Sequence, residues 1–344
     1  MIEIYKNWEL LTMSPVFTSF IWRRRFSRSG EFQFVTDFNK DIWEYFEPMI
    51  LDRQGNIIKQ GNIVYKRDTN EAAFIESRQK FDTFAGGQVM IIRGRFLSSL
   101  LDRRIVTLEG NFTLQNLLNN IINNNFLAAA GSLRSMAPAV RLLPFTLPGI
   151  NIFAEYRSRN AYDIITDLLN QHFIGVRTIK NFNTRSFDIE FYMPAETDTV
   201  FNKEFNNILE QDYYEDTKQY RNVVYIDERD GGGFIHNNTA FTGFNRREMG
   251  TAAPREGSHT LTQTAIDALT QNSAVRTLTS VINPYNYQFE YLKDWDIGSV
   301  VLSESAALQY SEREIITEIS EHYDQSGLNI EVSTGSYIDR RSRR

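Results

Sequence analysis

Histidine is the side chain most often used to bind a metal or to move a proton near neutral pH, so its placement is informative. The chain has four histidines, His172, His236, His259 and His322. None lies within helical or hairpin spacing of another, as a pair of metal ligands would need. We interpret each as an ordinary surface or boundary residue and expect no metal site. The chain has no cysteine, so disulfides and thiolate chemistry are excluded.

Two groups of acidic residues could in principle do chemistry. Paired carboxylates held about 5–10 Å apart can hydrolyse a glycosidic bond, but alternate acids along a strand more simply form a solvated face, which is how we interpret the first group. The second group lacks the glycine that a calcium loop of the EF-hand kind requires, and we interpret it as a polar connection. The first group is Glu312, Glu314, Glu318 and Glu321, and the second is Glu210, Asp212, Glu215 and Asp216, beside Tyr213 and Tyr214.

Motifs for nucleotide binding and acyl transfer are missing from the sequence. The triple glycine Gly231-Gly232-Gly233 is not followed by the Lys-Ser/Thr that would hold phosphate and magnesium, so we expect a loop or hairpin tip there. The sequence contains no G-x-S-x-G elbow, no P-loop and no dinucleotide fingerprint. We therefore predict no catalytic residue, no cofactor-binding residue and no cofactor.

Arginine is concentrated in two runs. Arg23-Arg24-Arg25 would place arginines on both faces of a strand, and two alternatives stay open for it: a plain exposed face, or an interface with a partner. The C-terminal run, Arg340 to Arg344, is either a solvated end or a segment that docks on an acidic neighbour.

Bulk composition indicates a β-rich chain that is not built to hold nucleic acid or cross a membrane. The 25 Phe and 16 Tyr fit the pleated, half-buried surfaces of sheets. A net charge of −6 argues against a dedicated nucleic-acid binder, but suits a wall that DNA slides past. The N-terminus is a poor signal peptide. The longest apolar stretch, Leu142 to Phe153, contains Pro144 and Pro148 and is too short to span a bilayer, so we expect no stable membrane insertion.

Residues 1–107 read as short strands. In the segment from Trp22 to Val35, the period-2 pattern places Phe26, Phe32 and Phe34 on one side, with a turn at Ser29-Gly30. Six or so strands without a long helix predict a small barrel or sandwich.

Residues 108–205 read as an α+β insert. Phe112 to Asn124 carries a helical apolar stripe with Thr113 as its cap, and Ala161 to Phe173 predicts a second helix. An irregular loop over residues 128–149 and a strand from Phe187 to Met193 complete this part.

Residues 206–344 read as a second β unit interrupted by a helix within about residues 261–282. We expect the strand Asn222 to Asp227 to pair with Phe241 to Arg247. The predicted helix is built from Ile266, Leu269, Val275 and Leu278, and strands follow at Gly298 to Leu302, Arg313 to Tyr323 and after a turn at 324–327. The predicted fold is therefore α+β and β-rich, with two small β-barrel-like domains (1–107 and 206–344) flanking an α+β insert domain (108–205).

Several segments in this order resemble the tail-hub, or tail-tip, proteins of siphophages, which are similar to the baseplate hub of contractile phages and the hub part of type VI secretion spikes. Each is a strand-and-turn signature, and together they cover nearly the whole chain. Ser299 stands where the family usually has Asp, at a position that shapes a turn. The segments are Arg28–Phe32, Gly61–Val64, Ala73–Glu76, Ile91–Arg95, Leu100–Ile105, Tyr220–Tyr225, Asp294–Val300 and Arg313–Ile319.

The resemblance implies a structural subunit. Three copies, each with two similar barrels, would form a ring that closes the tail tube and matches its six-fold symmetry. The implied partners are the distal tail protein, the tape-measure protein and receptor-binding or spike proteins, with DNA passing through the channel without specific binding. The implied location is the virion tail tip, after assembly in the host cytoplasm.

Two alternatives stay open beside the hub. One is a tail-associated cell-wall hydrolase; since the chain stops at Arg344, about where the hub portion should end, we expect no hydrolase domain after it. The other is a receptor- or carbohydrate-binding tip module, which the core-like spacing of the aromatic residues disfavours.

Overall fold

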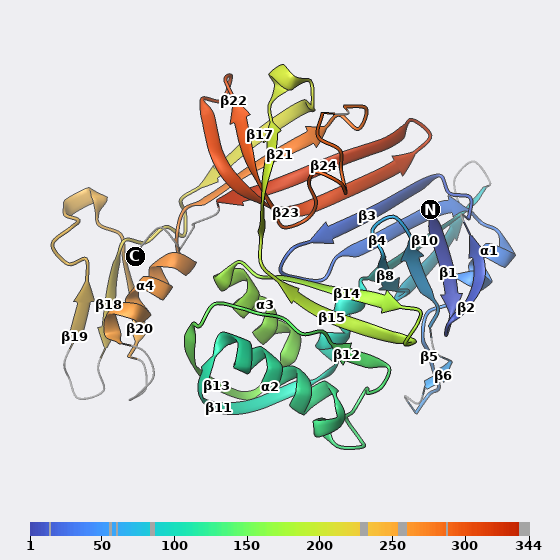
Figure 1. Cartoon of the computed structure of the whole chain (residues 1–344), viewed down its shortest axis with the longest axis horizontal. Helices are drawn as coiled ribbons and strands as arrows, with labels where there is room; N and C mark the ends of the chain where they lie inside the picture. Colours follow the sequence, from blue (N-terminus) through green and yellow to red (C-terminus); the bar gives the residue numbers. More distant parts are fainter. Residues whose placement is uncertain are drawn as a thin grey trace.

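Strands dominate the structure, a computed structural model that describes residues 1–13, 15–54, 57–59, 61–82, 87–227, 233–253, 260–286 and 288–336 (Figure 1). Four α-helices and several sheets are present in these residues, which confirms the predicted α+β, β-rich class. Closure of the sheets into two barrels stays a prediction.

The first and last parts of the chain share one ten-stranded sheet. Its main path runs β17-β21-β24-β23-β3-β4-β10-β9, and β22 pairs with both β23 and β16 beside that path. The two parts join where β3 lies antiparallel to β23, from Phe20 opposite Tyr323 to Arg25 opposite Glu318. The strands are β3 (Ser19–Arg25), β4 (Glu31–Asp37), β9 (Ser77–Asp82), β10 (Gln88–Arg95), β16 (Ala195–Phe201), β17 (Ile208–Asp216), β21 (Val275–Ile282), β22 (Ser299–Ser305), β23 (Tyr310–Asp324) and β24 (Gly327–Ser336).

The alternation predicted between Trp22 and Val35 is confirmed for β3 and β4. Phe32 and Phe34 are buried on one side with Phe20 and Trp22. Phe26 differs from the prediction, because it follows the end of β3 and packs in a separate apolar cluster with residues of β22, β23 and β24.

A seven-stranded sheet carries the chain from its N-terminus into its middle. The order is β12-β15-β14-β8-β7-β1-β2, and β14 meets β8 at Ile179 and Glu71. Strands thus pair across residue 107, and β16 pairs with β22 across residue 205, so the proposed domains are in continuous hydrogen-bonded contact. The strands are β1 (Ile2–Lys6), β2 (Glu9–Met13), β7 (Ile63–Lys66), β8 (Glu71–Phe74), β12 (Val140–Leu142), β14 (Gly175–Asn181) and β15 (Ser186–Tyr192); the small pieces α1 (Lys40–Tyr45), β5 (Ile50–Leu51) and β6 (Ile57–Lys59) lie between β4 and β7.

Both helices predicted for the middle of the chain are confirmed. The Thr113 side chain accepts a hydrogen bond from the Asn116 amide at the start of α2, and Asn160 caps α3 in the same way. The apolar stripes of the two helices share one buried core. Among the described residues, no helix has the length and apolar character needed to cross a membrane. The elements here are η1 (Leu97–Arg103), β11 (Ile105–Thr113), α2 (Leu114–Phe126), η2 (Ala128–Ala130), β13 (Asn151–Asn160) and α3 (Ala161–His172).

A small sheet with one helix stands apart at the left of Figure 1. Its order is β19-β18-β20, and α4 packs on it through Ala265 against Val224 and Ile226. The pairing predicted for Phe241 to Arg247 is wrong, because this segment contains the short turn η4 and the partner strand of β18 begins only at Glu248. The elements are η3 (Lys203–Phe205), β18 (Val223–Asp227), β19 (Gly233–His236), η4 (Gly243–Asn245), β20 (Glu248–Ala252) and α4 (Leu261–Gln271).

The helix predicted within residues 261–282 is correct only in its first half. It ends after Gln271, where Asn272 donates its backbone and side-chain N–H groups to the Ala268 carbonyl. Val275 and Leu278 belong instead to β21, in which Leu278, Ser280 and Ile282 are buried at alternate positions. The β-branched residues of this stretch favour a strand, and the period of 2 decides over the period of 3.6.

Lys180, on β14, is a buried cation enclosed by aromatic rings. Its Nζ atom lies 3.1 Å from the ring centroid of Tyr5, 4.6 Å from that of Phe182 and 5.1 Å from that of Trp8. Nζ has no hydrogen-bond partner among the described residues. Burial lowers the pKa of Lys180 to about 7, against the opposing charge of Glu3. The ring faces attract the charged form by about 0.5–2 kcal/mol, which offsets part of the cost of burial.

This cage predicts a pH-dependent stability that Lys180→Met removes. Above the lowered pKa, the unfolded lysine binds a proton that the folded one lacks, so the free energy of unfolding should rise between pH 7 and pH 9 by about 1–2 kcal/mol. Urea denaturation at both pH values measures this rise in the wild type and in Lys180→Met, where it should be lost.

Lys80→Met is the matched control, because Lys80 also lies over a ring, that of Phe38, but on the exposed edge strand β9. It should keep the wild-type rise. An equal rise in Lys180→Met and the wild type would contradict the assignment.

Candidate functional site

The three histidines that the structure describes lie on separate elements. His172 ends α3, His236 lies on β19 and His322 lies on β23, and each is half-buried. His259 lies outside the described residues. Within the part of the chain that the structure describes, no group of three or more His, Asp or Glu side chains could hold a metal ion.

Two further candidates fall mainly outside the described residues. Of the triple glycine, Gly231 and Gly232 lie outside the described residues, and Gly233 begins β19. The C-terminal run from Arg340 to Arg344 does so entirely.

The first acidic group lies on β23, but its members do not share a surface. Glu312 is exposed and Glu318 is half-buried, whereas Glu314 and Glu321 are 0% and 1% exposed. The expected solvated face is therefore wrong for two of the four residues. The physical reason is that β23 is an interior strand, flanked by β3, β22 and β24, and packs against the apolar cores.

The buried position of Glu314 prevents carboxylate-pair chemistry. Glu312 is two residues away, about 7 Å along a strand, which is a separation that glycosidases use. However, the Thr334 hydroxyl donates to Glu314 at 2.6 Å, the Tyr310 hydroxyl donates to its other oxygen, and burial raises the pKa of Glu314. The Glu314 carboxyl group is not exposed and therefore cannot donate a proton directly to a substrate.

The second acidic group forms a strand instead of the expected polar connection. Glu210, Asp212, Glu215 and Asp216 all lie on β17, which pairs with β21 and forms one end of the ten-stranded sheet. Tyr213 lies between these acidic residues on β17. Its ring packs against Tyr310 at the start of β23, with the two ring centroids 5.3 Å apart.

The arginine run at 23–25 splits between the two faces of β3. Arg23 forms an ion pair with Glu31 at 2.7 Å, and Arg25 forms one with Glu318 at 2.8 Å, on the more exposed face. Arg24 points the other way and is 2% exposed. Neither alternative left open for this run, an exposed face or an interface with a partner, describes Arg24, because its partners lie inside the same chain.

Arg24 is the centre of a buried ion network. Its Nε donates to Glu71 on β8 at 2.7 Å, and its two terminal nitrogens donate to both carboxylate oxygens of Asp296. The Trp22 indole N–H also donates to Glu71, at 3.2 Å, and Arg24 donates to the Tyr291 hydroxyl at 2.9 Å. Three segments far apart in the sequence therefore meet at one guanidinium.

The network continues from Tyr291 to a second buried cation. The Tyr291 hydroxyl donates to Glu321 at 2.9 Å, and the Lys66 ammonium lies 2.7 Å from Glu321 and 2.6 Å from Asp68. Lys66 and Glu321 are each 1% exposed. The network, from Asp68 to Arg24, ties β7 and β8 of one sheet to β3 and β23 of the other.

Neighbouring charges favour the ionised forms of Arg24 and Asp68. Burial alone would lower the pKa of Arg24, but the charges of Glu71 and Asp296 raise it well above its ordinary value. Burial would raise the pKa of Asp68, but Lys66 lowers it. The cations Arg24 and Lys66 are buried, whereas Asp296 and Asp68 at the two ends of the network are 36% and 39% exposed. Each charge has a partner of opposite sign, so the network can fix the positions of the strands that carry it.

The segment Asp294–Val300, which carries part of the resemblance, is the turn that presents Asp296 to Arg24. The Asp296 amide donates to the Ser299 hydroxyl at 2.9 Å, and the Ser299 amide donates back to the Asp296 carbonyl. Gly298 has φ +83°, and a Cβ there would lie 2.5 Å from the Phe26 ring. Ser299 thus shapes a turn, as expected.

Gly94, in another of these segments, is required by close packing. A Cβ at this position would lie 1.8 Å from the Phe74 carbonyl oxygen. Both segments therefore lie where the backbone packs closely on a neighbouring element, which agrees with a structural role for them.

Sequence reasoning missed Lys66, Glu71 and Asp296 as members of one site. The available signal was a charge at the end of a short apolar strand, as in Ile63–Lys66 and Glu71–Phe74. That signal does not say which face meets water, and so it could not pair these residues with Arg24.

Replacing Arg24 by Met should destabilise the protein by about 3 kcal/mol, the lower end of the range for a broken buried ion pair, because the buried Glu71 loses its cationic partner while Asp296 is 36% exposed and stays solvated. Arg23→Met, on the exposed side of the same strand, should cost less than about 1 kcal/mol. Urea denaturation measures both, and Glu71→Gln added to Arg24→Met should recover part of the loss. Equal effects of the two arginine substitutions would refute the central position of Arg24.

The family model described as Siphovirus ReqiPepy6 Gp37-like protein matches residues 2–336. No curated protein sequence matches the chain.

Several solved structures share the fold at low sequence identity. The tail protein from Neisseria meningitidis MC58 has a TM-score of 0.59 and 12% identity, over 97% of this chain and 96% of that chain. The 43 kDa tail protein of prophage MuSo2 from Shewanella oneidensis has a TM-score of 0.60 and 13% identity, over 97% of both chains. A chain of the Francisella PdpA–VgrG complex has a TM-score of 0.52 and 10% identity, over 98% of this chain but 57% of that one.

These identities show the fold alone, while the family model covers nearly the whole sequence. The expected resemblance to siphophage tail proteins is confirmed. The chain belongs to the family of Siphovirus ReqiPepy6 Gp37-like proteins.

Proposed function

We propose that this protein is the hub of a phage tail tip or baseplate and is a structural component of the virion. The observation that carries the proposal is the family match over residues 2–336, joined to a fold that tail proteins share along their full length. A chain of the Francisella PdpA–VgrG complex also shares the fold over 98% of this chain.

The hub acts by forming a ring of three copies at the end of the tail tube. Each copy contributes two β units, so three copies give six similar units below a six-fold tube. Support comes from the joined sheet, which fixes the two β units against each other through β3 and β23. The ends of the ten-stranded sheet, β17 and β9, present strand edges that contacts between subunits can cover.

The ring leaves a channel for DNA and contacts the neighbouring tail components. A net charge of −6 suits a wall that does not retain phosphates. The partners are the distal tail protein and the tape-measure protein on the tube side, and receptor-binding or spike proteins on the outer side. We place the protein at the tail tip after assembly in the host cytoplasm.

The proposed role is not enzymatic. The two buried glutamates of β23 are enclosed: Glu314 by Thr334 and Tyr310, and Glu321 by Lys66 and Tyr291. Buried carboxyl groups of this kind position strands, whereas a catalytic pair of carboxyl groups must be exposed to its substrate.

Native mass spectrometry of the purified protein tests the ring. The expected species has three times the 40.0 kDa mass of the chain, alone or with the distal tail protein. Electron microscopy of tails decorated with antibody should label the tip and not the tube. Single subunits under all these conditions, or tips without label, would refute the proposal.

A further inference from the structure

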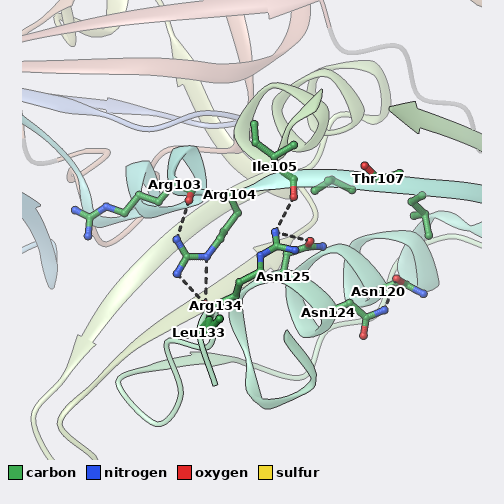
Figure 2. Close-up of a pocket in the computed structure, with 11 residues that line it drawn as sticks. Arg103, Arg104, Ile105, Thr107, Asn120, Asn124, Asn125, Leu133 and Arg134 are labelled. Atoms are coloured by element: carbon green, nitrogen blue, oxygen red, sulfur yellow. Dashed lines mark hydrogen bonds between the residues drawn. The ribbon is translucent and has the colours of Figure 1, made fainter. Parts of the chain in front are cut away.

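A basic hollow of about 650 Å³ lies where β11 begins, beside the end of α2 and the segment 131–135 (Figure 2). Arg104 and Arg134 both face it, and Asn125 on α2 closes one side. Arg103 contributes its backbone, because its side chain points away and its guanidinium lies 4.5 Å from the Phe74 ring centroid. The hollow therefore centres on two guanidinium groups.

Neutral oxygens hold the two guanidinium groups in place. Arg104 donates from Nη2 to the Arg134 carbonyl at 2.8 Å and from Nη1 to the Arg103 carbonyl at 2.8 Å. Arg134 donates to the Ile105 carbonyl at 2.7 Å and to the Asn125 side-chain oxygen at 3.0 Å. These bonds fix the orientation of the cations but neutralise neither charge.

The two cations lack an anionic partner in the part of the chain that the structure describes, where neither Arg104 nor Arg134 forms an ion pair. Burial lowers the pKa of Arg104, and the charge of Arg134 lowers it further. Two like charges that the fold holds together favour binding of an anion, and a guanidinium group fits a carboxylate in bidentate geometry.

The rim of the hollow favours a protein as the source of that anion. Leu133 is 98% exposed and Ile105 is 50% exposed, and both line the hollow. Exposed apolar side chains next to cations suit a peptide segment that carries acids and an apolar or aromatic residue. A free phosphate or a DNA backbone would leave these apolar surfaces in water.

The chain itself exposes such a segment on β17. Glu210, Asp212 and Tyr214 lie at alternate positions and so share one face of this edge strand, and all three are exposed. Among the described residues, neither Glu210 nor Asp212 forms an ion pair, and Tyr214 is 53% exposed.

One copy cannot bring the two surfaces together. Figure 1 shows β17, at one end of the ten-stranded sheet, at the top of the molecule and α2 and β11 at the bottom, with β14 and β15 between them. Complementary surfaces at opposite ends of one chain form a head-to-tail contact between copies, and such contacts generate a ring when the rotation closes.

We propose that the acidic face of β17 in one copy docks on the basic hollow of the next, with Glu210 and Asp212 meeting Arg104 and Arg134. Tyr214 packs beside Leu133 in this contact. The inference rests on the proposed ring and deepens it, since it names the surfaces that join successive subunits.

Reciprocal charge reversal tests the contact. Arg134→Glu and Asp212→Arg should each weaken association of the subunits by about tenfold or more, because each places like charges opposite each other. The double variant should recover to within about threefold of the wild type. Sedimentation velocity over a range of protein concentrations measures the association.

Controls separate this contact from general effects of charge or folding. Arg93→Glu changes another exposed arginine, whose Nε bonds Gln33, and should leave association unchanged. Leu133→Ser, at a side chain that is 98% exposed, should weaken association while leaving the thermal unfolding midpoint as in the wild type.

The possible outcomes distinguish the contact from the hub itself. Single reversals without effect on an assembled wild type, or a double variant that does not recover, overturn the contact while the hub stands. A wild type that never associates overturns both. Duplex DNA bound by the wild type and lost in Arg134→Glu would assign the hollow to nucleic acid and also overturn the contact.

Discussion

The fold depends on one buried guanidinium group, that of Arg24, which must be paired with carboxylates. Arg24 sits inside the protein at 2% exposure, and its two carboxylate partners come from residues 71 and 296. A buried charge without partners costs several kcal/mol, so any arrangement that separates these three segments is penalised. The network therefore requires three segments, around residues 24, 71 and 296, to meet. The pairing of β3 with β23 in one sheet brings the first and last parts of the chain together.

This constraint acts more on specificity than on net stability. Buried ion pairs often stabilise no more than apolar residues of the same volume, because desolvation offsets the attraction. What they exclude is the wrong register. A shift of β3 by one residue against β23 would turn Arg24 toward the exposed face and place Arg23 and Arg25 inside, away from Glu31 and Glu318. We infer that the alternation of three arginines fixes the position of one half of the molecule on the other.

Sequence patterns predicted the local elements better than the tertiary partners. Helix α2 could be predicted because an apolar stripe follows a polar cap at Thr113, and helix α3 could be predicted from its apolar stripe. The pattern was misleading at Val275, where apolar residues with helical spacing belong to strand β21. It was also misleading at Glu210, where a polar segment predicted as a connection is strand β17. It could not reveal the ion network, since a period of 2 shows which residues share a face but not whether that face meets water or a second sheet. The glutamates of β23 show this most clearly, because Glu312 and Glu314 share the same pattern and differ completely in exposure.

Among the described residues, some arginines are paired with carboxylates and others are held only by neutral oxygens. Arg24 is paired with carboxylates, whereas Arg104 and Arg134 are held only by carbonyl and amide oxygens. The first arrangement is complete within one copy and can only hold its own strands together. The second is oriented but unneutralised, at the surface and beside exposed leucine, which leaves attraction available for something outside the chain. For a protein that is proposed to build a ring, the two kinds of arginine serve different purposes. Ion pairs inside each subunit stabilise its fold, and unpaired charges at the surface are available for assembly.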